Sequence, residues 1–339
     1  MPCFIIAEAG VNHNGSLDLA LSLVDAAADA GADAVKFQTF KADSLVKRGT
    51  ARAEYQLDGK CKNDQHEMIA ALELNESQHE AICKRCAIRG IEFMSTPFDL
   101  WALDLLVGLG VRRLKIPSGE LTNRPFIESI AQRGLPMILS SGMATLDEVK
   151  RTLSWLVPSR QKSRLQDWLT VLHCTSNYPT APSDVNLLAM RTLESALGIP
   201  VGYSDHTLGI DVPIAAVALG ATIIEKHFTL DQNLPGPDHK MSLNPAQLSA
   251  MIAGVRNVEL ALGNGIKEPT PTELPIRRLV RRSAFTRNKL PAGHTIELND
   301  IEFLRPGDGI GPEFANELLG RKIVCSLAAG HRLDWKDLM

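Results

Sequence analysis

Residues 200–227 read PVGYSDHTLGIDVPIAAVALGATIIEKH, and this stretch carries the pattern that decides the fold. Two short apolar runs, Pro200–Gly202 and Ala221–Ile224, flank a helical pattern over Ile210–Leu219 that ends at Gly220. Continuous apolar runs are typical of strands buried on both faces, as in a parallel sheet covered by helices. A glycine directly after a helical pattern is a common stop signal. The stretch therefore predicts a strand–helix–strand unit with polar residues after each strand.

The same pattern recurs over the first three quarters of the chain. The eight apolar runs are Phe4–Ala7, Ala34–Phe37, Ile91–Met94, Arg112–Ile116, Pro136–Leu139, Leu169–Leu172, Pro200–Gly202 and Ala221–Ile224. Capping residues precede several of the helical patterns between them, namely Ser16, Asn75 and Thr145. Eight strand–helix units over about 260 residues are typical of a (β/α)8 TIM barrel. A doubly wound open sheet is the main alternative.

Composition narrows the class of protein. The 339 residues are 45% hydrophobic and 22% charged, which is ordinary for a globular chain with a large and a small domain. A formal net charge of −3 argues against a nucleic-acid partner. No apolar stretch reaches the roughly 20 residues that span a bilayer, and the N-terminus lacks a signal peptide's basic flank. Six cysteines, including the Cys83–Cys86 pair, are interpreted as ordinary reduced thiols, so we expect a cytoplasmic protein without membrane contact.

The C-terminal part has a different character. Residues 1–263 are assigned to the barrel, 264–281 to a linker that begins rich in Pro, Thr and Gly, and 282–339 to a small β-rich domain. The strands expected in this domain are Ser283–Thr286, Thr295–Glu297 and Lys322–Cys325. So small a unit has little core and would gain from docking on another surface.

Reactive side chains follow almost every apolar run of the barrel. In a barrel, the C-terminal ends of all eight strands meet at one rim, where the connecting loops build the active site. We therefore predict an enzyme. Lys36 and Lys115, with Ser118, Ser140 and Ser204, form a set of cations and hydroxyls suited to phosphate or carboxylate. A Schiff base on either lysine, as in class I aldolases, is the alternative use of these residues.

Two histidines at neighbouring strand ends form a second candidate group. His206 and His227 could share one divalent ion while leaving positions open for water and substrate oxygens. With only two protein ligands, such a site would suit an exchangeable ion such as Mn²⁺ or Mg²⁺. Glu8 and Glu120 are candidates for proton transfer, and the rigid turn at residues 235–240 would hold Asp238 over the rim.

Several longer stretches together match a known family. They are Ile6–Gly15, Lys36–Thr39, Lys115–Glu120, Leu139–Met143, His173–Pro179, Gly202–Thr207, Glu225–Thr229 and Pro235–Asp238. In this order, and over nearly the whole chain, they resemble the sialic acid (bacterial nonulosonate) synthases. The end of the chain, from Arg282 through Phe303–Ile310, resembles the antifreeze-like (SAF) domain that ends these enzymes.

The resemblance implies a metal-dependent condensation of phosphoenolpyruvate with an N-acetylated mannose-type sugar to give N-acetylneuraminate. It implies that His206 and His227 bind Mn²⁺, or another divalent ion such as Mg²⁺. The residues that would hold phosphoenolpyruvate are Lys36, Lys115, Ser118, Ser140, Ser204 and either Ser176 or Asn177. Glu120 would handle the water that adds to the intermediate. The residues that would position the sugar are Glu8, Gln38, Tyr178 and Asp238, with Arg305 reaching across a domain-swapped homodimer.

Two other readings stay open. Residues Ala53–Gln56 and 230–238 look closer to the branch that makes legionaminic acid or spore-coat sugars, which predicts 2,4-diacetamido-2,4,6-trideoxymannose as the alternative substrate. Apart from the Schiff-base aldolase, the alternative from another class is a non-catalytic ice- or sugar-binding protein, suggested by the C-terminal domain alone.

Overall fold

The computed structural model describes residues 2–52, 64–156 and 164–339, which divide into two compact units, Met1–Gly263 and Asn264–Met339. The eight parallel strands of the first unit are β1 (Phe4–Gly10), β2 (Ala34–Thr39), β3 (Glu92–Pro97), β4 (Leu114–Ile116), β5 (Met137–Ser140), β6 (Leu169–Cys174), β7 (Val201–Asp205) and β8 (Ile223–His227). Their order is β3-β2-β1-β8-β7-β6-β5-β4, and the two end strands β3 and β4 also lie in contact. The sheet therefore curls into a barrel, and the (β/α)8 prediction is confirmed over the open sheet.

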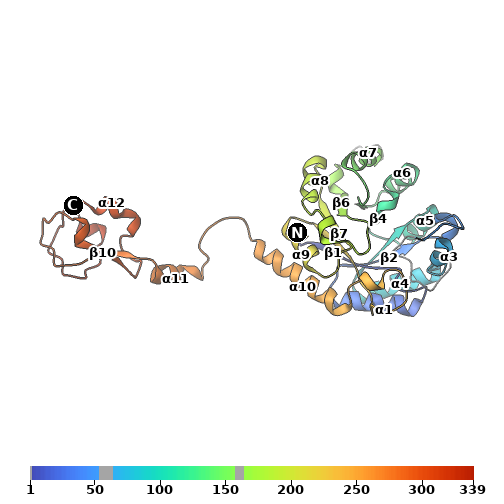
Figure 1. Cartoon of the computed structure of the whole chain (residues 1–339), viewed down its shortest axis with the longest axis horizontal. Coiled ribbons are helices and arrows are strands. Elements are labelled where there is room, and N and C mark those ends of the chain that lie inside the picture. The colour runs from blue at the N-terminus through green and yellow to red at the C-terminus, as the bar shows by residue number, and fades with distance from the viewer. Residues whose placement is uncertain (1, 53–63, 157–163) are drawn as a thin grey trace. The chain divides into compact units, whose positions relative to one another are not determined.

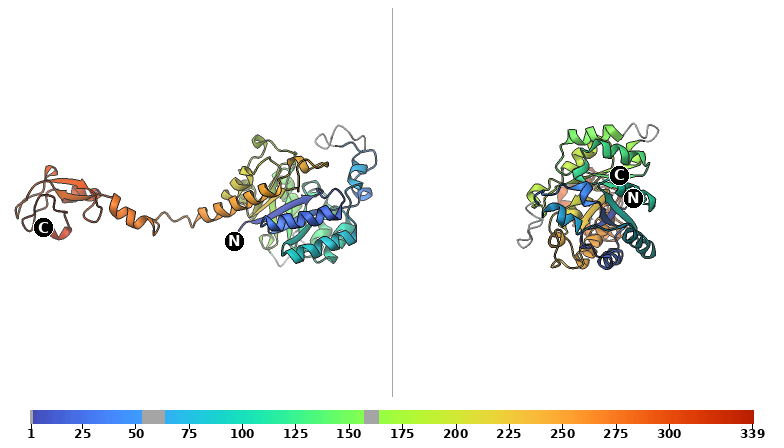
Figure 2. Two further views of the ribbon diagram at one scale, coloured as in Figure 1. Left: turned by 90° about the horizontal axis from the view of Figure 1, so that it is seen from below. Right: turned by 90° about the vertical axis from the view of Figure 1, so that its right-hand side faces the viewer.

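Helices surround the strands, as Figures 1 and 2 show. They are α1 (Leu17–Asp29), α2 (Ala42–Leu45), α3 (Gln65–Ala70), α4 (Glu76–Arg89), α5 (Leu100–Gly108), α6 (Arg124–Gln132), α7 (Leu146–Leu156), α8 (Ala189–Leu197), α9 (Asp211–Ala218) and α10 (Pro245–Leu262). The predicted caps form. Ser16 accepts a hydrogen bond from the Leu19 amide, and Asn75 makes a reciprocal capping box with Gln78. Helix α4 ends at Gly90, whose φ of 70° is left-handed and favours glycine.

Two apolar layers stabilise the barrel. The larger layer lies between strands and helices and includes Leu23, Ile82 and Leu103, all fully buried. The smaller layer fills the barrel interior with Ile6, Ala34, Met94, Ile138, Leu172 and Ile223. This inner plug lies one or two residues before the polar side chains of the strands. The strands therefore end in reactive groups on a filled, rigid base.

The second unit has its own small core, made of Ala284, Leu290, Ile296, Ile301, Ile310, Leu318, Ile323, Leu327, Leu333 and Leu338. Strand β9 (Ser283–Thr286) forms as predicted and pairs antiparallel with β10 (Ile301–Leu304), which the sequence interpretation missed. The predicted strands Thr295–Glu297 and Lys322–Cys325 were wrong as strands. They meet only in a single bridge between Thr295 and Lys322, because a turn starts at Glu297.

The predicted linker at 264–281 is not all loop. Helix α11 (Glu273–Val280) occupies its second half, and the short helix α12 (Ala315–Leu318) follows later in this unit. The Thr270 amide and hydroxyl both donate to the Glu273 carboxylate, which satisfies backbone groups where α11 begins. This local cap outweighs the Pro and Thr content that predicted a linker. No helix within the described ranges is long and apolar enough to cross a membrane.

Candidate active site

The C-terminal mouth of the barrel contains a cavity of about 380 Å³. All eight strands or the segments directly after them contribute to its wall. The predicted site residues that line it are Glu8, Lys36, Gln38, Lys115, Ser118, Ser140, Ser176, Tyr178, Ser204, His206 and His227. Residues far apart in the sequence therefore converge, as the barrel prediction requires.

Four predicted residues lie elsewhere. Glu120 ends the short 3-10 helix Ser118–Glu120 beside the mouth, where its carboxylate accepts a hydrogen bond of 2.6 Å from Asn123. Asn177 is exposed, and its side chain accepts from the Tyr178 amide. Asp238 is buried next to the cavity, 3.8 Å from the Nδ1 atom of His227. Arg305 is exposed directly after β10 in the second unit.

Two lysines and two glutamates form a buried charge cluster at the base of the cavity. The Lys36 Nζ atom lies 2.8 Å from Glu8 and 3.7 Å from Glu225, and the Lys115 Nζ atom lies 3.0 Å from Glu225. Each of these four side chains is at most 6% exposed. Glu225 was not among the site residues predicted from sequence. Its place between the two lysines follows from the closure of the barrel, which no local pattern shows.

Burial and the two lysines balance differently at Glu8 and Glu225, so the two carboxylates have different proton affinities. Burial raises the pKa of Glu8 to about 7, against the influence of Lys36. Burial acts on Glu225 in the same direction, but Lys115 and Lys36 outweigh it and hold the pKa of Glu225 at about 2. Burial also lowers the pKa of Lys115. Near neutral pH, Glu225 is therefore ionised and Glu8 exchanges a proton. Protonation of Glu8 removes one negative charge from the cluster, which favours an anion in the cavity.

Hydroxyl groups complete one side of the cavity. Ser118 accepts a hydrogen bond of 3.0 Å from the Gly142 amide, and Ser204 donates to Glu225. A Cβ atom on Gly142 would lie 2.3 Å from the Ser176 hydroxyl and 2.8 Å from that of Ser118, so only glycine lets these hydroxyls converge. The Ser140 hydroxyl is buried and has no hydrogen-bond partner within the described residues. A buried hydroxyl without a partner points to a ligand, since such groups are almost always satisfied.

The two predicted metal-binding imidazoles lie side by side on the cavity wall. The ring centroids of His206 and His227 are 5.5 Å apart. The Nδ1 atom of His206 lies 2.7 Å from the Thr175 carbonyl oxygen and donates to it, so the neutral form of this ring carries its lone pair on Nε2. Burial lowers the pKa of His227 well below its usual value, so this ring is neutral.

These two histidines fit a divalent ion held by few protein ligands. The His227 Nδ1 atom is buried and has no hydrogen-bond partner in the described part of the chain. A neutral imidazole with an unused nitrogen is the form that binds metal ions. Among the described residues, no three side chains of His, Cys, Asp or Glu come together as a complete metal site. Any ion here would therefore keep positions for water or substrate.

Other residues of the wall carried little or no signal in the sequence. Thr96, Phe98, Met143 and Cys174 also line the cavity. The Cys174 sulfur lies 3.8 Å from Ser118 Oγ and 3.8 Å from His206 Nδ1. Thr96 is one of the polar side chains that follow an apolar run, so the barrel prediction brings it to the rim, whereas an apolar side chain such as Phe98 cannot be separated from core residues by its type alone.

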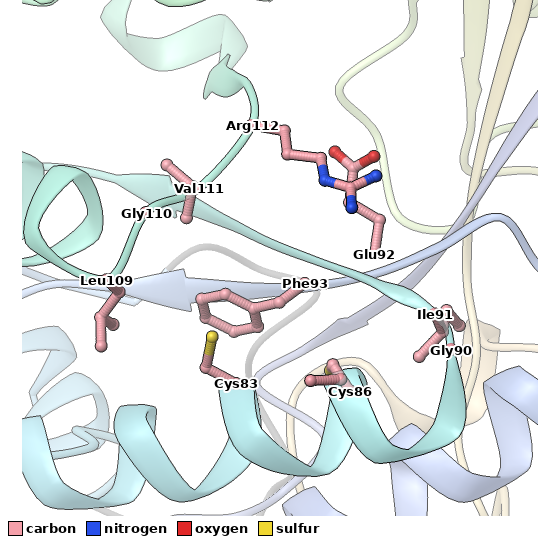
Figure 3. A pocket seen from close by; sticks show the side chains of 11 residues that line it. Cys83, Cys86, Gly90, Ile91, Glu92, Phe93, Leu109, Gly110, Val111 and Arg112 are labelled. Carbon is pink, nitrogen blue, oxygen red and sulfur yellow. The ribbon is translucent and has the colours of Figure 1, made fainter.

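A second cavity, of about 430 Å³, lies at the opposite end of the barrel (Figure 3). It is enclosed by the end of α4, the start of β3 and the segment between α5 and β4. Cys83 and Cys86 are both free thiols on its wall. Burial raises the pKa of Cys86 to about 12, so its thiol stays protonated and unreactive. The mouth, where charged and hydroxyl groups converge, is therefore the candidate active site.

A barrel whose C-terminal mouth combines buried lysines, converging hydroxyls and two adjacent imidazoles defines an enzyme for a small anionic substrate. A family model described as the NeuB family matches residues 23–267, and the SAF domain matches residues 281–339. The chain therefore belongs to the NeuB family, with a SAF domain at its C-terminal end, and the resemblance to sialic acid synthases is confirmed.

Individual relatives support this assignment over nearly full length. The chain is 51% identical over 339 residues to the N,N'-diacetyllegionaminic acid synthase of Legionella pneumophila, covering 100% of this chain and 95% of that one. It is 35% identical to human N-acetylneuraminate-9-phosphate synthase, covering 96% and 90%. The crystal structure of N-acetylneuraminic acid synthetase from Leptospira borgpetersenii, in complex with citrate, aligns with a TM-score of 0.71 and 37% identity, covering 81% and 90%. The chain is thus an enzyme, and the non-catalytic alternative is wrong.

Proposed function

We propose that this enzyme condenses phosphoenolpyruvate with 2,4-diacetamido-2,4,6-trideoxymannose and releases phosphate, giving N,N'-diacetyllegionaminate. The sequence interpretation put N-acetylneuraminate first and this product second. The comparisons favour the second, because identity to a diacetyllegionaminate synthase is 51% against 35% for the human N-acetylneuraminate-9-phosphate synthase. One of the two segments that suggested this branch, Ala53–Gln56, lies outside the described residues.

The observation that carries the proposal is the anion pocket beside two imidazoles. Phosphoenolpyruvate brings a phosphate and a carboxylate, which need several cationic and hydroxyl donors. Lys115 and Lys36 supply charge, while Ser118, Ser140 and Ser176 supply directional hydrogen bonds from the wall where Gly142 leaves room. The unpartnered Ser140 hydroxyl gains a partner when the anion binds. The sequence left open whether Ser176 or Asn177 contacts phosphate. Ser176 is the better candidate, because the Asn177 side chain is exposed and already accepts a hydrogen bond from the Tyr178 amide.

His206 and His227 are proposed to hold the divalent ion, Mn²⁺ or Mg²⁺. When bound, such an ion polarises the aldehyde oxygen of the open-chain sugar and makes its carbon a better electrophile. The protein contributes the neutral state of His227 and the orientation of His206 through Thr175. The neighbouring ring of Tyr178, whose centroid is 4.1 Å from that of His206, limits the position of the sugar.

The reaction proposed for this site balances without further reactants. C3 of phosphoenolpyruvate bonds to the aldehyde carbon, positive charge develops at C2, and water adds there. Phosphate then leaves by cleavage of the C–O bond. We assign to Glu8, which exchanges a proton near neutral pH, the protonation of the aldehyde oxygen as it becomes an alcohol. The cation at C2 forms close to the ionised Glu225, which the two lysines hold in place.

Sugar recognition is proposed for Gln38, Tyr178 and Asp238. The Gln38 amide lies 3.5 Å from Glu8, and Asp238 lies 3.8 Å from the Nδ1 atom of His227. Arg305 would complete the site from the SAF domain of a partner subunit in a domain-swapped homodimer. Glu120 is still proposed to handle the water, from its position beside the mouth. We place the reaction in the cytoplasm.

A side-by-side assay tests the proposal. Purified enzyme receives phosphoenolpyruvate and Mn²⁺ with either N-acetylmannosamine or 2,4-diacetamido-2,4,6-trideoxymannose, and phosphate release and product mass are measured. We expect kcat/KM to be higher for the diacetamido sugar. A preference for N-acetylmannosamine restores the first interpretation. Absence of any phosphate release with both sugars overturns the proposed reaction.

A further inference from the structure

An ion pair lies behind the candidate active site, on the other side of the same two strands. In β7 and β8, Ser204, Glu225 and His227 line the cavity, and alternate residues of a strand face opposite sides. Asp205 and Lys226 are paired in the strand register and point away from the cavity. Both are only 1% exposed. Each lies in the chain between two residues that line the cavity, and each directly precedes a candidate metal ligand, but neither lines the cavity itself.

The contacts of this pair converge on the residue that follows His206. The Asp205 carboxylate accepts from the Thr207 amide and hydroxyl, both at 3.0 Å, and from the Tyr203 hydroxyl at 2.9 Å. The Lys226 Nζ atom donates to Asp205 at 2.6 Å and also to the Thr207 carbonyl oxygen. Thr207 is fully buried and is thereby fixed at its N–H, its C=O and its side chain.

The same contacts connect the two strands that carry the imidazoles. Lys226 precedes His227 directly, and through Thr207 and Asp205 it fixes both neighbours of His206. The His206 carbonyl also accepts a hydrogen bond of 2.8 Å from the Thr180 amide. The buried Lys226 side chain of β8 therefore holds the residues on either side of His206 by hydrogen bonds. Moving β7 relative to β8 would change the separation of the two rings and break several buried hydrogen bonds at once.

Stability alone does not explain a charged pair at this position. Side chains on the helix-facing side of a barrel strand are ordinarily apolar, as Val201 and Ile224 are in the same two strands. Burying two charges is offset only by good geometry, and well-packed apolar residues often serve stability as well or better. Two apolar side chains make no hydrogen bonds. They could not hold the amide and the carbonyl group of Thr207, as Asp205 and Lys226 do.

We propose that Asp205 and Lys226 are positioning residues that set the separation and orientation of His206 and His227 for a shared divalent ion. The inference rests on the proposed function in that it takes these histidines as the metal ligands. The pair touches neither substrate nor ion and acts only through the backbone of Thr207 and His206.

The test measures Mn²⁺ binding directly, by calorimetry on the full-length chain without substrates. The variants are Lys226→Met, Asp205→Asn and the double variant. We expect each single variant to weaken Mn²⁺ binding by roughly 10- to 100-fold, as loss of supporting hydrogen bonds around metal ligands typically does. The matched control is Arg113→Met, which breaks another ion pair between neighbouring strands, with Glu92 at the far end of the barrel. It should leave Mn²⁺ affinity unchanged.

The double variant separates positioning from stability. Removing both charges avoids an unpaired buried charge, so thermal stability should recover relative to Lys226→Met. Mn²⁺ affinity should stay low, because the Thr207 carbonyl is still not held. Recovery of Mn²⁺ affinity together with stability would overturn the proposal, as would wild-type affinity in a folded single variant. If Lys226→Met does not fold, Asp205→Asn and the double variant decide on the same criteria. Failure of the unmodified enzyme to bind Mn²⁺ would instead count against the proposed metal site.

Discussion

The two ends of the barrel use charged residues in opposite ways. At the C-terminal mouth, Lys36, Lys115, Glu8 and Glu225 are almost completely buried inside the barrel and share one cavity. At the other end, the ion pairs are partly exposed and lie around the strand starts. Arg113 there is 28% exposed. The buried charges at the mouth are costly to bury and are available to a ligand. The partly exposed ion pairs at the other end are screened by solvent and only connect strands. Substitutions at the mouth should therefore change activity more than stability, and those at the far end the reverse.

The largest effect is expected for His227→Ala. Losing one of the two proposed metal ligands should remove several kcal/mol of transition-state stabilisation, which corresponds to a fall in kcat of about a thousandfold or more. The fold should survive, because the ring makes no hydrogen bond at Nδ1 within the described residues. Phosphate release with both substrates measures activity, and circular dichroism checks the fold. Chelation of the unmodified enzyme should reproduce the loss. Turnover within tenfold of the unmodified enzyme would show that His227 is not a ligand.

The next effect concerns pH and Glu8. Its pKa is raised from 4.5 to about 7 in the folded chain, so between these values the folded state binds more protons than the unfolded state. The free energy of unfolding should then fall as the pH rises through this window, by about 3 kcal/mol at most. Glu225, whose pKa is lowered to about 2, acts in the opposite sense at lower pH, where its contribution is lost as the pH falls from 4.5.

Urea unfolding at several pH values between 5 and 7 measures this dependence. Glu8→Gln keeps the shape of the side chain but does not titrate, so its free energy of unfolding should fall less over the same range. Equal slopes for Glu8→Gln and the unmodified enzyme would mean that Glu8 keeps an ordinary pKa. An ordinary pKa would in turn remove the basis for its proton transfer near neutral pH.

Much of the fold and site was predictable from sequence for one physical reason. Strands buried on both faces are continuous apolar runs, and a barrel brings the residues after those runs to one rim. His206, Lys115 and Ser140 could be placed in this way without any knowledge of tertiary contacts. The resemblance to known synthases added roles for them.

What sequence could not show depends on which strands are neighbours. Glu8 and Glu225 share Lys36 because β1 lies between β2 and β8 in the closed sheet. The pairing of Asp205 with Lys226 likewise depends on the register of β7 and β8. Helix α11 was missed because a local hydrogen bond between Thr270 and Glu273 decides its start, against the general composition of the segment.

A moderate effect is expected for Lys115→Met. A hydrogen bond to a charged group contributes about 1.5–3 kcal/mol, so the KM for phosphoenolpyruvate should rise by roughly 10- to 100-fold. The substitution also tests the Schiff-base alternative, which the lowered pKa of Lys115 would favour. Borohydride added during turnover should trap no covalent adduct on the unmodified enzyme, measured by intact-protein mass. An adduct that disappears in Lys115→Met would establish imine chemistry in place of the metal mechanism.

The smallest effect is expected at the far end, for Arg113→Met. The Arg113 guanidinium donates to the Glu92 carboxylate at 2.8 and 3.1 Å and lies 4.3 Å from the centroid of the Phe4 ring. It therefore covers the apolar plug of the barrel where Phe4 meets solvent. Partly exposed ion pairs and cation–π contacts each contribute about 1 kcal/mol or less, so thermal denaturation should show a fall in Tm of about 2–4 °C. The KM for phosphoenolpyruvate should not change, because no residue of this cluster reaches the mouth cavity. A change in KM with little loss of stability would mean that the two ends are coupled through the apolar plug. The proposed difference, in which the mouth determines activity and the other end contributes stability, would then be wrong.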